Sequence, residues 1–169
     1  GFCLVGSEMC IRDSINTDAE GRLIMADALA FASESKPDII CDVATLTGAA
    51  YVALGVEIGA VFSNNKVTLD SFLNSNNDGF ENYHSLPLEQ SYKSQIKSNI
   101  ADMKNSGGRF GGAITAALLL EEFVDDLNWI HLDIAGPARS RSSNSIYPEG
   151  GTGFGVLGYF NFLANEAND

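Results

Sequence analysis

The sequence predicts an α/β fold of three layers, in which a mostly parallel central sheet is flanked by helices. Short runs rich in β-branched and apolar residues alternate with longer helix-forming runs along most of the chain. Glycine-rich stretches separate several of these runs and indicate loops. No internal repeat and no linker interrupts the alternation, so we expect a single domain from residue 15 to residue 169.

Local patterns place the individual elements. Asn16, Thr17 and Asp18 are helix-capping residue types, and a strong helix-forming run from Leu23 to Ala32 follows them. Apolar or alternating runs of five or six residues indicate strands. The expected loops lie at 44–49, 107–112 and 150–153. The other expected elements are strands at 38–43, 58–62 and 129–134, helices at 67–77 and 113–124, and a last helix that ends near Asn165.

Composition excludes some classes of partner. The formal net charge is −12, so the chain should repel nucleic-acid phosphates, and we expect no nucleic acid among its partners. No apolar run approaches the roughly 20 residues of a membrane-spanning helix, and no membrane association is expected. Cys3, Cys10 and Cys41 follow neither a disulfide framework nor a zinc-ligand spacing. We therefore expect reduced thiols and a cytoplasmic location.

The first fourteen residues are expected to be foreign to the fold. Residues 4–14 read Leu-Val-Gly-Ser-Glu-Met-Cys-Ile-Arg-Asp-Ser. This run of eleven residues resembles one reading frame of a transposon adapter that is used to prepare DNA libraries. A signal peptide would need basic residues followed by an apolar run of sufficient length, which this segment lacks. We interpret residues 1–14 as an artefact segment and begin the native part at Ile15.

The stretch from Asn16 to Leu23 concentrates groups that carry chemistry. It places two carboxylates and a guanidinium within five positions, at Asp18, Glu20 and Arg22. In an extended backbone these three side chains would share one face. Two carboxylates suit a divalent cation, an arginine suits an anion, and Gly21 would allow a close backbone approach or an unusual φ. Spacing alone favours a plainer alternative, a helix start with a first-turn glutamate and a surface arginine.

This stretch resembles the signature of the cytosol leucyl aminopeptidase family. Three further blocks resemble the family in the same order along the chain. They are residues 42–49, which read Asp-Val-Ala-Thr-Leu-Thr-Gly-Ala, residues 107–116 around the glycine-rich loop, and residues 131–136, which read His-Leu-Asp-Ile-Ala-Gly. The resemblance extends from about Ile15 to the C-terminus. Four blocks in register are far more specific than any one motif.

The resemblance implies an activity and a set of site residues. The family has an α/β catalytic domain and uses two bridged metal ions, Mn²⁺ or Zn²⁺, to release N-terminal residues, leucine preferred, from peptides. It implies that Asp18 and Glu20 bind metal, with Glu20 bridging the two ions, and that Arg22 is the catalytic residue that holds a bicarbonate-like anion. The residues implied to line the substrate site are Thr45, Leu46, Gly48 and Ala135.

The resemblance also bears on completeness and assembly. A metal pair activates a bridging water and polarises the scissile carbonyl, and binding of the free α-amine restricts cleavage to the N-terminal residue. In the family the other ligands, a lysine and two aspartates, and a catalytic lysine lie upstream of the signature. Residues 15–169 are therefore expected to be the C-terminal part of a catalytic domain, inactive alone. The family further implies peptide substrates, a cytoplasmic location and a homo-oligomer, namely a hexamer.

Other residues are expected to have structural roles. His84 and His131 stand in no ligand spacing, and Cys41 lies in an expected buried strand. Asp133 is expected to be a buried, hydrogen-bonded carboxylate. The loop at 107–112 lacks the Gly-Lys-Ser/Thr ending of a phosphate loop, which disfavours a phosphate- or nucleotide-binding protein. The alternative that stays open is a non-enzymatic α/β interaction or assembly domain, a degenerate paralogue of the family.

Overall fold

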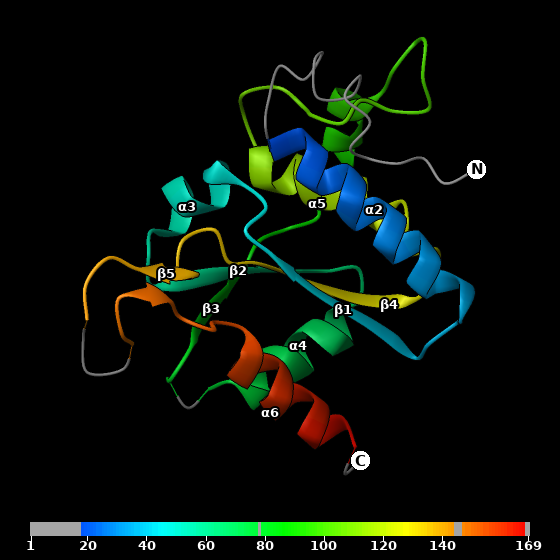
Figure 1. Ribbon diagram of the computed structural model, residues 1–169. Helices are drawn as coiled ribbons and strands as arrows, with labels where there is room; N and C mark the ends of the chain where they lie inside the picture. The colour runs from blue at the N-terminus through cyan, green and yellow to red at the C-terminus, as the bar shows by residue number, and fades with distance from the viewer. Residues whose placement is uncertain (1–17, 78, 144–146, 168–169) are drawn as a thin grey trace.

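The computed structural model describes residues 18–77, 79–143 and 147–167 (Figure 1). Along the chain these residues form α2 (Asp18–Glu34), β1 (Ile39–Ala44), α3 (Gly48–Leu54), β2 (Ile58–Ser63), α4 (Lys66–Ser75), β3 (Asn82–Ser85), the 3₁₀ helix η1 (Gln90–Ile96), α5 (Gly112–Glu121), β4 (Asn128–Asp133), β5 (Arg139–Ser140), β6 (Gly150–Gly151) and α6 (Val156–Glu166). The predicted artefact segment at 1–14 lies outside the described residues and stays a prediction.

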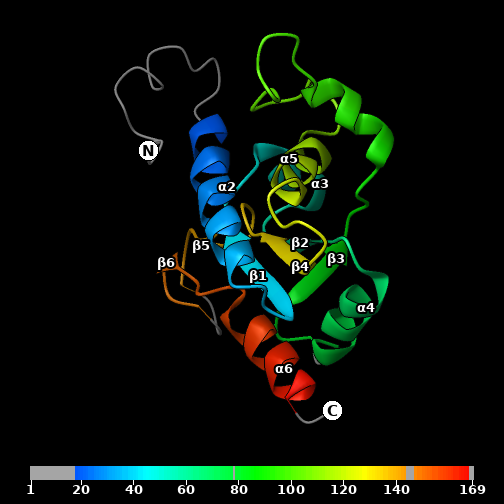
Figure 2. The same ribbon diagram turned by 90° about the vertical axis from the view of Figure 1, so that its right-hand side faces the viewer.

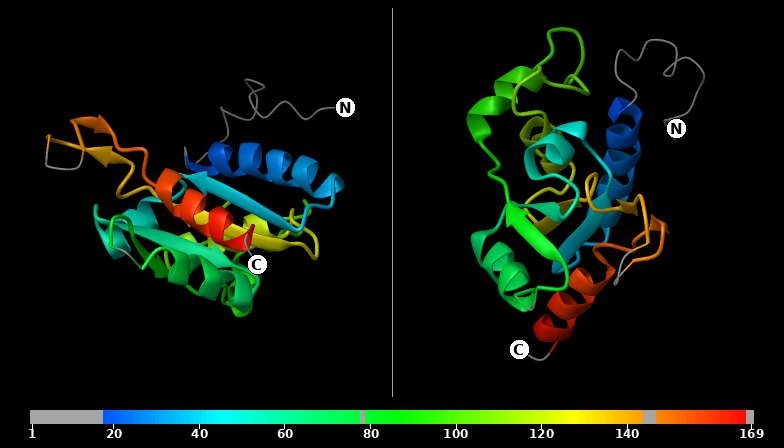
Figure 3. Two further views of the ribbon diagram at one scale, coloured as in Figure 1. Left: turned by 90° about the horizontal axis from the view of Figure 1, so that it is seen from below. Right: turned by 90° about the vertical axis from the view of Figure 1, so that its left-hand side faces the viewer.

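The central sheet has the strand order β1-β4-β2-β3. β1 pairs with β4 and β2 pairs with β3 in parallel, whereas β2 and β4 are antiparallel. The mostly parallel sheet that the sequence predicts is confirmed. β5 and β6 form a separate two-stranded antiparallel sheet, which projects from the main body of the fold (Figure 3).

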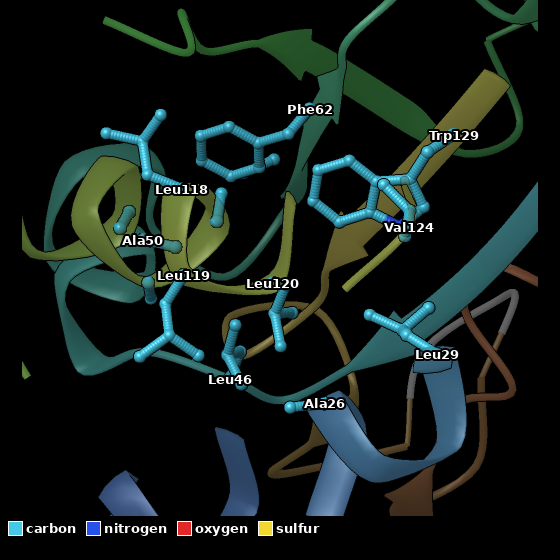
Figure 4. Packing of buried hydrophobic residues seen from close by; sticks show 14 of the residues in the cluster. Ala26, Leu29, Leu46, Ala50, Phe62, Leu118, Leu119, Leu120, Val124 and Trp129 are labelled. Carbon is cyan, nitrogen blue, oxygen red and sulfur yellow. The ribbon is translucent and has the colours of Figure 1, made fainter. Parts of the chain in front are cut away.

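Helices cover both faces of this sheet and complete the three layers. α2, α3 and α5 lie on one face, and α4 and α6 lie on the other (Figure 1; Figure 2). Side chains alternate along β4, so each face has its own core. Trp129 joins the core under α2 and α5, shown in Figure 4, and Ile130 and Leu132 join the core under α4 and α6.

α5 is almost wholly apolar, as the sequence predicts, because it lies between other elements. Its residues from Ala116 to Leu120 are at most 1% exposed, and a helix that is apolar on all sides requires burial of this kind. α5 has only ten residues. Among the described residues, no helix is both long and apolar enough to cross a membrane.

The buried carboxylate of Glu81, the residue just before β3, holds the start of α6 in place. Glu81 is 6% exposed and accepts hydrogen bonds from the N–H groups of Gly155 at 2.9 Å and Gly158 at 2.7 Å. The Tyr83 hydroxyl donates to the same carboxylate at 2.6 Å. The negative group satisfies N–H donors that have no partner within the first turn and suits the positive end of the helix dipole. Burial, together with this hydrogen bond, raises the pKa of Tyr83.

Gly21 lies within α2, so the unusual φ or close backbone approach that the sequence suggested is wrong. Its φ is not in the left-handed region, and no atom lies within 4 Å of the position that a Cβ would take. Glycine destabilises a helix interior relative to alanine. Gly21→Ala is therefore expected to raise the free energy of unfolding of the chain by about 0.5–1 kcal/mol, measured by urea denaturation. A lower free energy of unfolding would contradict the open surroundings of Gly21.

Candidate functional site

Two loops meet at the carboxyl ends of neighbouring parallel strands. β1 ends at Ala44 and β4 ends at Asp133, and these two residues are opposite each other in the strand register. Just beyond them, the Ile134 N–H donates to the Ala44 carbonyl at 2.8 Å. In open α/β sheets, ligands bind outside the carboxyl ends of strands. This edge of the sheet is therefore the place where a site is expected.

The Asp133 carboxylate joins the two loops. It is 1% exposed, and its Oδ1 accepts hydrogen bonds from the Leu46 N–H at 3.1 Å and the Ala135 N–H at 3.2 Å. Its Oδ2 accepts from the Thr47 hydroxyl at 2.6 Å, and Thr47 Oγ1 in turn accepts from the Ala50 N–H at 3.0 Å. Thr47 is the N-cap of α3. Asp133 is thus the buried, hydrogen-bonded carboxylate that the sequence predicts.

Arg22 lies in a pocket beside these loops. Its side chain is 5% exposed although arginine is rarely buried, and Nη1 donates to the Asn105 carbonyl at 3.0 Å. The plainer alternative of a surface arginine is therefore wrong. The pocket has a volume of about 240 Å³. The residues that line it are Arg22, Thr47, Gly48, Ala49, Ser106, Gly107, Gly108, Arg109, Gly112 and Thr115.

The glycine-rich loop forms one wall of this pocket. The sequence indicated only a structural loop there, so its part in the pocket was missed. A Cβ on Gly107 would lie 2.9 Å from Thr115 Oγ1, so only glycine lets the loop approach α5 this closely. Gly111 has a φ of 66° and is the N-cap of α5. The close spacing of glycines immediately before a helix is the signal that could have indicated a pocket.

The charges around the pocket favour an anion. Among the described lining residues, Arg22 and Arg109 are cationic and none is acidic. Gly112, the first residue of α5, also lines the pocket, so the positive end of that helix dipole faces it. A small anion fits both the volume and the charge.

The predicted substrate-site residues fall in different surroundings. Gly48 lines the pocket together with Arg22. The Leu46 side chain is buried in the core between α2 and α5, which leaves its backbone to serve a site (Figure 4). Thr45 is exposed in the loop after β1, and Ala135 is half-buried in the loop after β4. The structure therefore groups Leu46, Gly48 and Ala135 around Asp133 and the pocket, while the exposed Thr45 does not line the pocket.

The predicted metal-binding residues are at the start of α2. The backbone from Asp18 onward is helical, so the extended segment that would put Asp18, Glu20 and Arg22 on one face is absent from the described chain. The side chains of Asp18 and Glu20 lie outside the part that the structure describes, and their roles stay predictions. Within the described residues, no group of three or more His, Cys, Asp or Glu side chains is placed to hold a metal ion.

His131 belongs to a buried cluster around Asp42 rather than to the pocket. Its Nδ1 lies 2.5 Å from Asp42 Oδ1, and the Trp129 indole N–H donates to Asp42 Oδ2 at 2.6 Å. The His131 ring is fully buried between Phe62 and Trp129. This agrees with the structural role expected for His131, whereas no sequence pattern indicated Asp42 as its partner. His84 is exposed on β3.

Cys41 is expected to be unreactive in the folded chain. Burial, and then the negative charge of Asp42, raise the pKa of its thiol to about 12, so very little thiolate exists near neutral pH. At pH 8 we expect iodoacetamide to alkylate Cys41 at least about tenfold more slowly in buffer than in urea, as measured on its tryptic peptide by mass spectrometry. Equal rates in the two solvents would contradict this burial.

Comparisons with known proteins agree with this fold. Residues 7–158 match the family model described as the cytosol aminopeptidase family, catalytic domain. A probable cytosol aminopeptidase of Synechococcus sp. (strain CC9902) is 50% identical over 153 residues, which are 90% of this chain and 31% of that protein. Another, of Syntrophotalea carbinolica, is 49% identical over 152 residues, with the same shares.

A solved structure of a mutant of tomato leucine aminopeptidase is also similar. Its TM-score is 0.82 at 41% sequence identity, and the match covers 89% of this chain and 29% of that one. The chain thus spans 31% of the length of the curated relatives named above. Since the family model matches most of the chain and the solved structure shares its fold, the chain belongs to the cytosol aminopeptidase family and forms part of its catalytic domain.

Proposed function

We propose that this chain supplies part of the catalytic site of a metal-dependent aminopeptidase, which releases N-terminal residues, leucine preferred, from peptides. The observation that carries the proposal is the buried Arg22, which lines a cationic pocket beside the loops at the carboxyl ends of β1 and β4. A guanidinium held in place beside a pocket is the kind of group that stabilises a developing negative charge in acyl-transfer chemistry.

The proposed cofactors are two divalent metal ions, Mn²⁺ or Zn²⁺, and a bicarbonate-like anion. Asp18 and Glu20 offer hard oxygen donors that suit such ions, but two carboxylates are fewer than a metal pair needs. The fit is therefore partial, and the remaining donors would have to come from beyond the described residues. When bound, the metal pair would generate hydroxide from water near neutral pH and polarise the scissile carbonyl.

The residues of this chain would bind and orient the reactants. Arg22 would hold a planar anion through its two-pronged guanidinium, with Arg109 and the first turn of α5 adding positive potential. The backbone from Leu46 to Gly48, together with Ala135, would position the substrate beside the pocket. We further propose a cytoplasmic location, because the relatives named above are probable cytosol aminopeptidases, and a homo-oligomer, a hexamer, which the family resemblance of the sequence implies.

A hybrid enzyme tests this function. In it, residues 18–158 of this chain replace the matching segment of the Synechococcus relative, so that the rest of that protein supplies what this chain lacks. With Mn²⁺ or Zn²⁺, the hybrid enzyme is expected to hydrolyse a leucine amide, whereas the 169-residue chain alone is expected to show no measurable hydrolysis. The unaltered relative is the positive control. A folded, metal-loaded hybrid without activity would contradict the proposal and favour a non-enzymatic assembly domain.

A further inference from the structure

We propose that Asp133 is a positioning residue, whose carboxylate sets the geometry of the substrate site by tying the loop after β1 to the loop after β4. This inference rests on the proposed function, because it concerns the residues that would position the substrate. The observations behind it do not involve the metal ions, since they are hydrogen bonds between described protein groups.

Asp133 is placed to control both loops at once. Leu46 and Ala135 are proposed substrate-site residues, and both backbone N–H groups donate to the same Oδ1 atom. Thr47, which lines the pocket, donates to Oδ2 at 2.6 Å. Leu46 and Thr47 lie 87 and 86 residues before Asp133, so no local turn could hold the two loops in register. Beyond the backbone hydrogen bond from Ile134 to Ala44, the Asp133 carboxylate supplies that link.

A carboxylate is the group that this position requires. All three donors point at one side chain, and only an ionised Asp or Glu offers acceptors at both oxygens with no donor of its own. Asparagine has nearly the same shape but presents an NH₂ group to one of the donors. If its oxygen keeps Leu46 and Ala135, the Thr47 hydroxyl loses its acceptor. The loss would loosen the segment that leads into α3, because Thr47 Oγ1 caps that helix.

The loop after β4 is held from its other side as well. A Cβ on Gly136 would lie 1.9 Å from the carbonyl oxygen of Gly55, which follows α3. Ala135 is therefore fixed between the Asp133 carboxylate and this close backbone contact. The start of α3 is tied to Asp133 through Thr47 and its end is packed on Gly136. Asp133 thus sets where α3, both loops and the adjoining pocket lie relative to one another.

The hybrid enzyme carries the test, with Glu81→Gln as the matched control for Asp133→Asn. Glu81 is also buried and also accepts three hydrogen bonds, but it caps α6, and none of its hydrogen-bond partners lines the Arg22 pocket, whereas the Asp133 partner Thr47 does. Both variants should lose stability. Only Asp133→Asn is expected to raise KM for a leucine amide roughly tenfold and to lower kcat/KM about a hundredfold, the scale of a misplacement near 1 Å. KM does not depend on the amount of folded enzyme, so a merely structural role would leave it unchanged.

Thr47 provides a second pair of variants if Asp133→Asn fails to fold. Thr47→Val removes the hydroxyl with little change of shape and should raise KM, and Thr47→Ser should bring KM back toward that of the unmutated hybrid enzyme. Normal KM in Asp133→Asn, or in Thr47→Val, would overturn the inference alone. A rise in KM of the same size in Glu81→Gln would overturn it too. An unmutated hybrid without activity would overturn the proposed function and this inference with it.

Discussion

Replacing Arg22 with lysine in the hybrid enzyme is expected to lower kcat for a leucine amide by roughly ten- to a thousandfold, the scale of losing an oriented electrostatic contact. Lysine keeps the charge but loses the planar, two-pronged donor set that matches a carbonate-like anion. Arg22 is 5% exposed and donates from Nη1 to the Asn105 carbonyl, so the fold rather than solvent sets the orientation of its guanidinium. The measurement is kcat and KM with and without added bicarbonate.

The response to bicarbonate distinguishes anion binding from general damage. Added bicarbonate should raise the activity of the unmutated hybrid more than that of Arg22→Lys. Because Arg22 is buried and hydrogen-bonded, the variant should also lose some stability, so kcat is compared at a temperature well below both melting transitions. Arg139→Lys, on an exposed arginine of β5, is the control and should change neither value. Unmutated kcat in Arg22→Lys, or an equal bicarbonate response in both proteins, would remove Arg22 from the proposed site.

Replacing Gly136 with alanine is expected to lower the free energy of unfolding of the 169-residue chain by about 3 kcal/mol, at the upper end of overpacking costs. The new Cβ would stand 1.9 Å from the Gly55 carbonyl oxygen. The new Cβ is fixed to the Gly136 backbone, the oxygen belongs to the Gly55 backbone, and Gly136 is buried. The clash can therefore be relieved only by moving either α3 or the end of β4. Urea denaturation followed by circular dichroism measures the change.

The same substitution at two other glycines provides comparison values for the change in the free energy of unfolding. Gly21→Ala introduces the same methyl group where nothing lies within 4 Å, and it should stabilise the chain. Gly158→Ala would place its Cβ 2.1 Å from the Tyr83 hydroxyl, a side-chain group that can move at the expense of its hydrogen bond to Glu81. Its cost should therefore lie between the other two. A free energy for Gly136→Ala within about 0.5 kcal/mol of the unmutated chain would show that the two loops are not rigidly packed.

Local patterns in the sequence were enough to predict the longer helices and strands but not the short ones. The apolar run of α5 and the strand that contains Trp129 were predicted within three residues of their bounds. Each is buried, and its burial shows as a hydrophobic pattern within its own stretch of sequence. α3, β3, η1, β5 and β6 were missed, and β6 lies in the stretch at 150–153 that was expected to be a loop. The four residues of β3 are too few for a periodic signal, and η1 depends on the Glu89 side chain, which accepts from the Ser91 N–H.

In the candidate site, too, features that depend on a short stretch of sequence could be predicted and features that depend on the tertiary fold could not. Arg22 could be singled out because it lies among charged residues in a short segment, although its burial could not be foreseen. The hydrogen bonds of Asp133 with Leu46 and Thr47 and the Asp42–His131 pair could not be predicted, since each depends on which strands lie side by side. The order β1-β4-β2-β3 sets those neighbours, and strand pairing over long separations leaves no mark in any one stretch of sequence.

The distance along the chain between β1 and β4 also governs how the protein is made. At ribosomal rates of about 5–20 residues per second, the 87 residues from Leu46 to Asp133 take roughly 4–17 s to synthesise. During that interval β1 has already been synthesised while β4, its parallel partner, does not yet exist. An unpaired strand edge on a nascent chain is a template for aggregation. The yield of soluble protein should therefore depend on how quickly this middle stretch is translated.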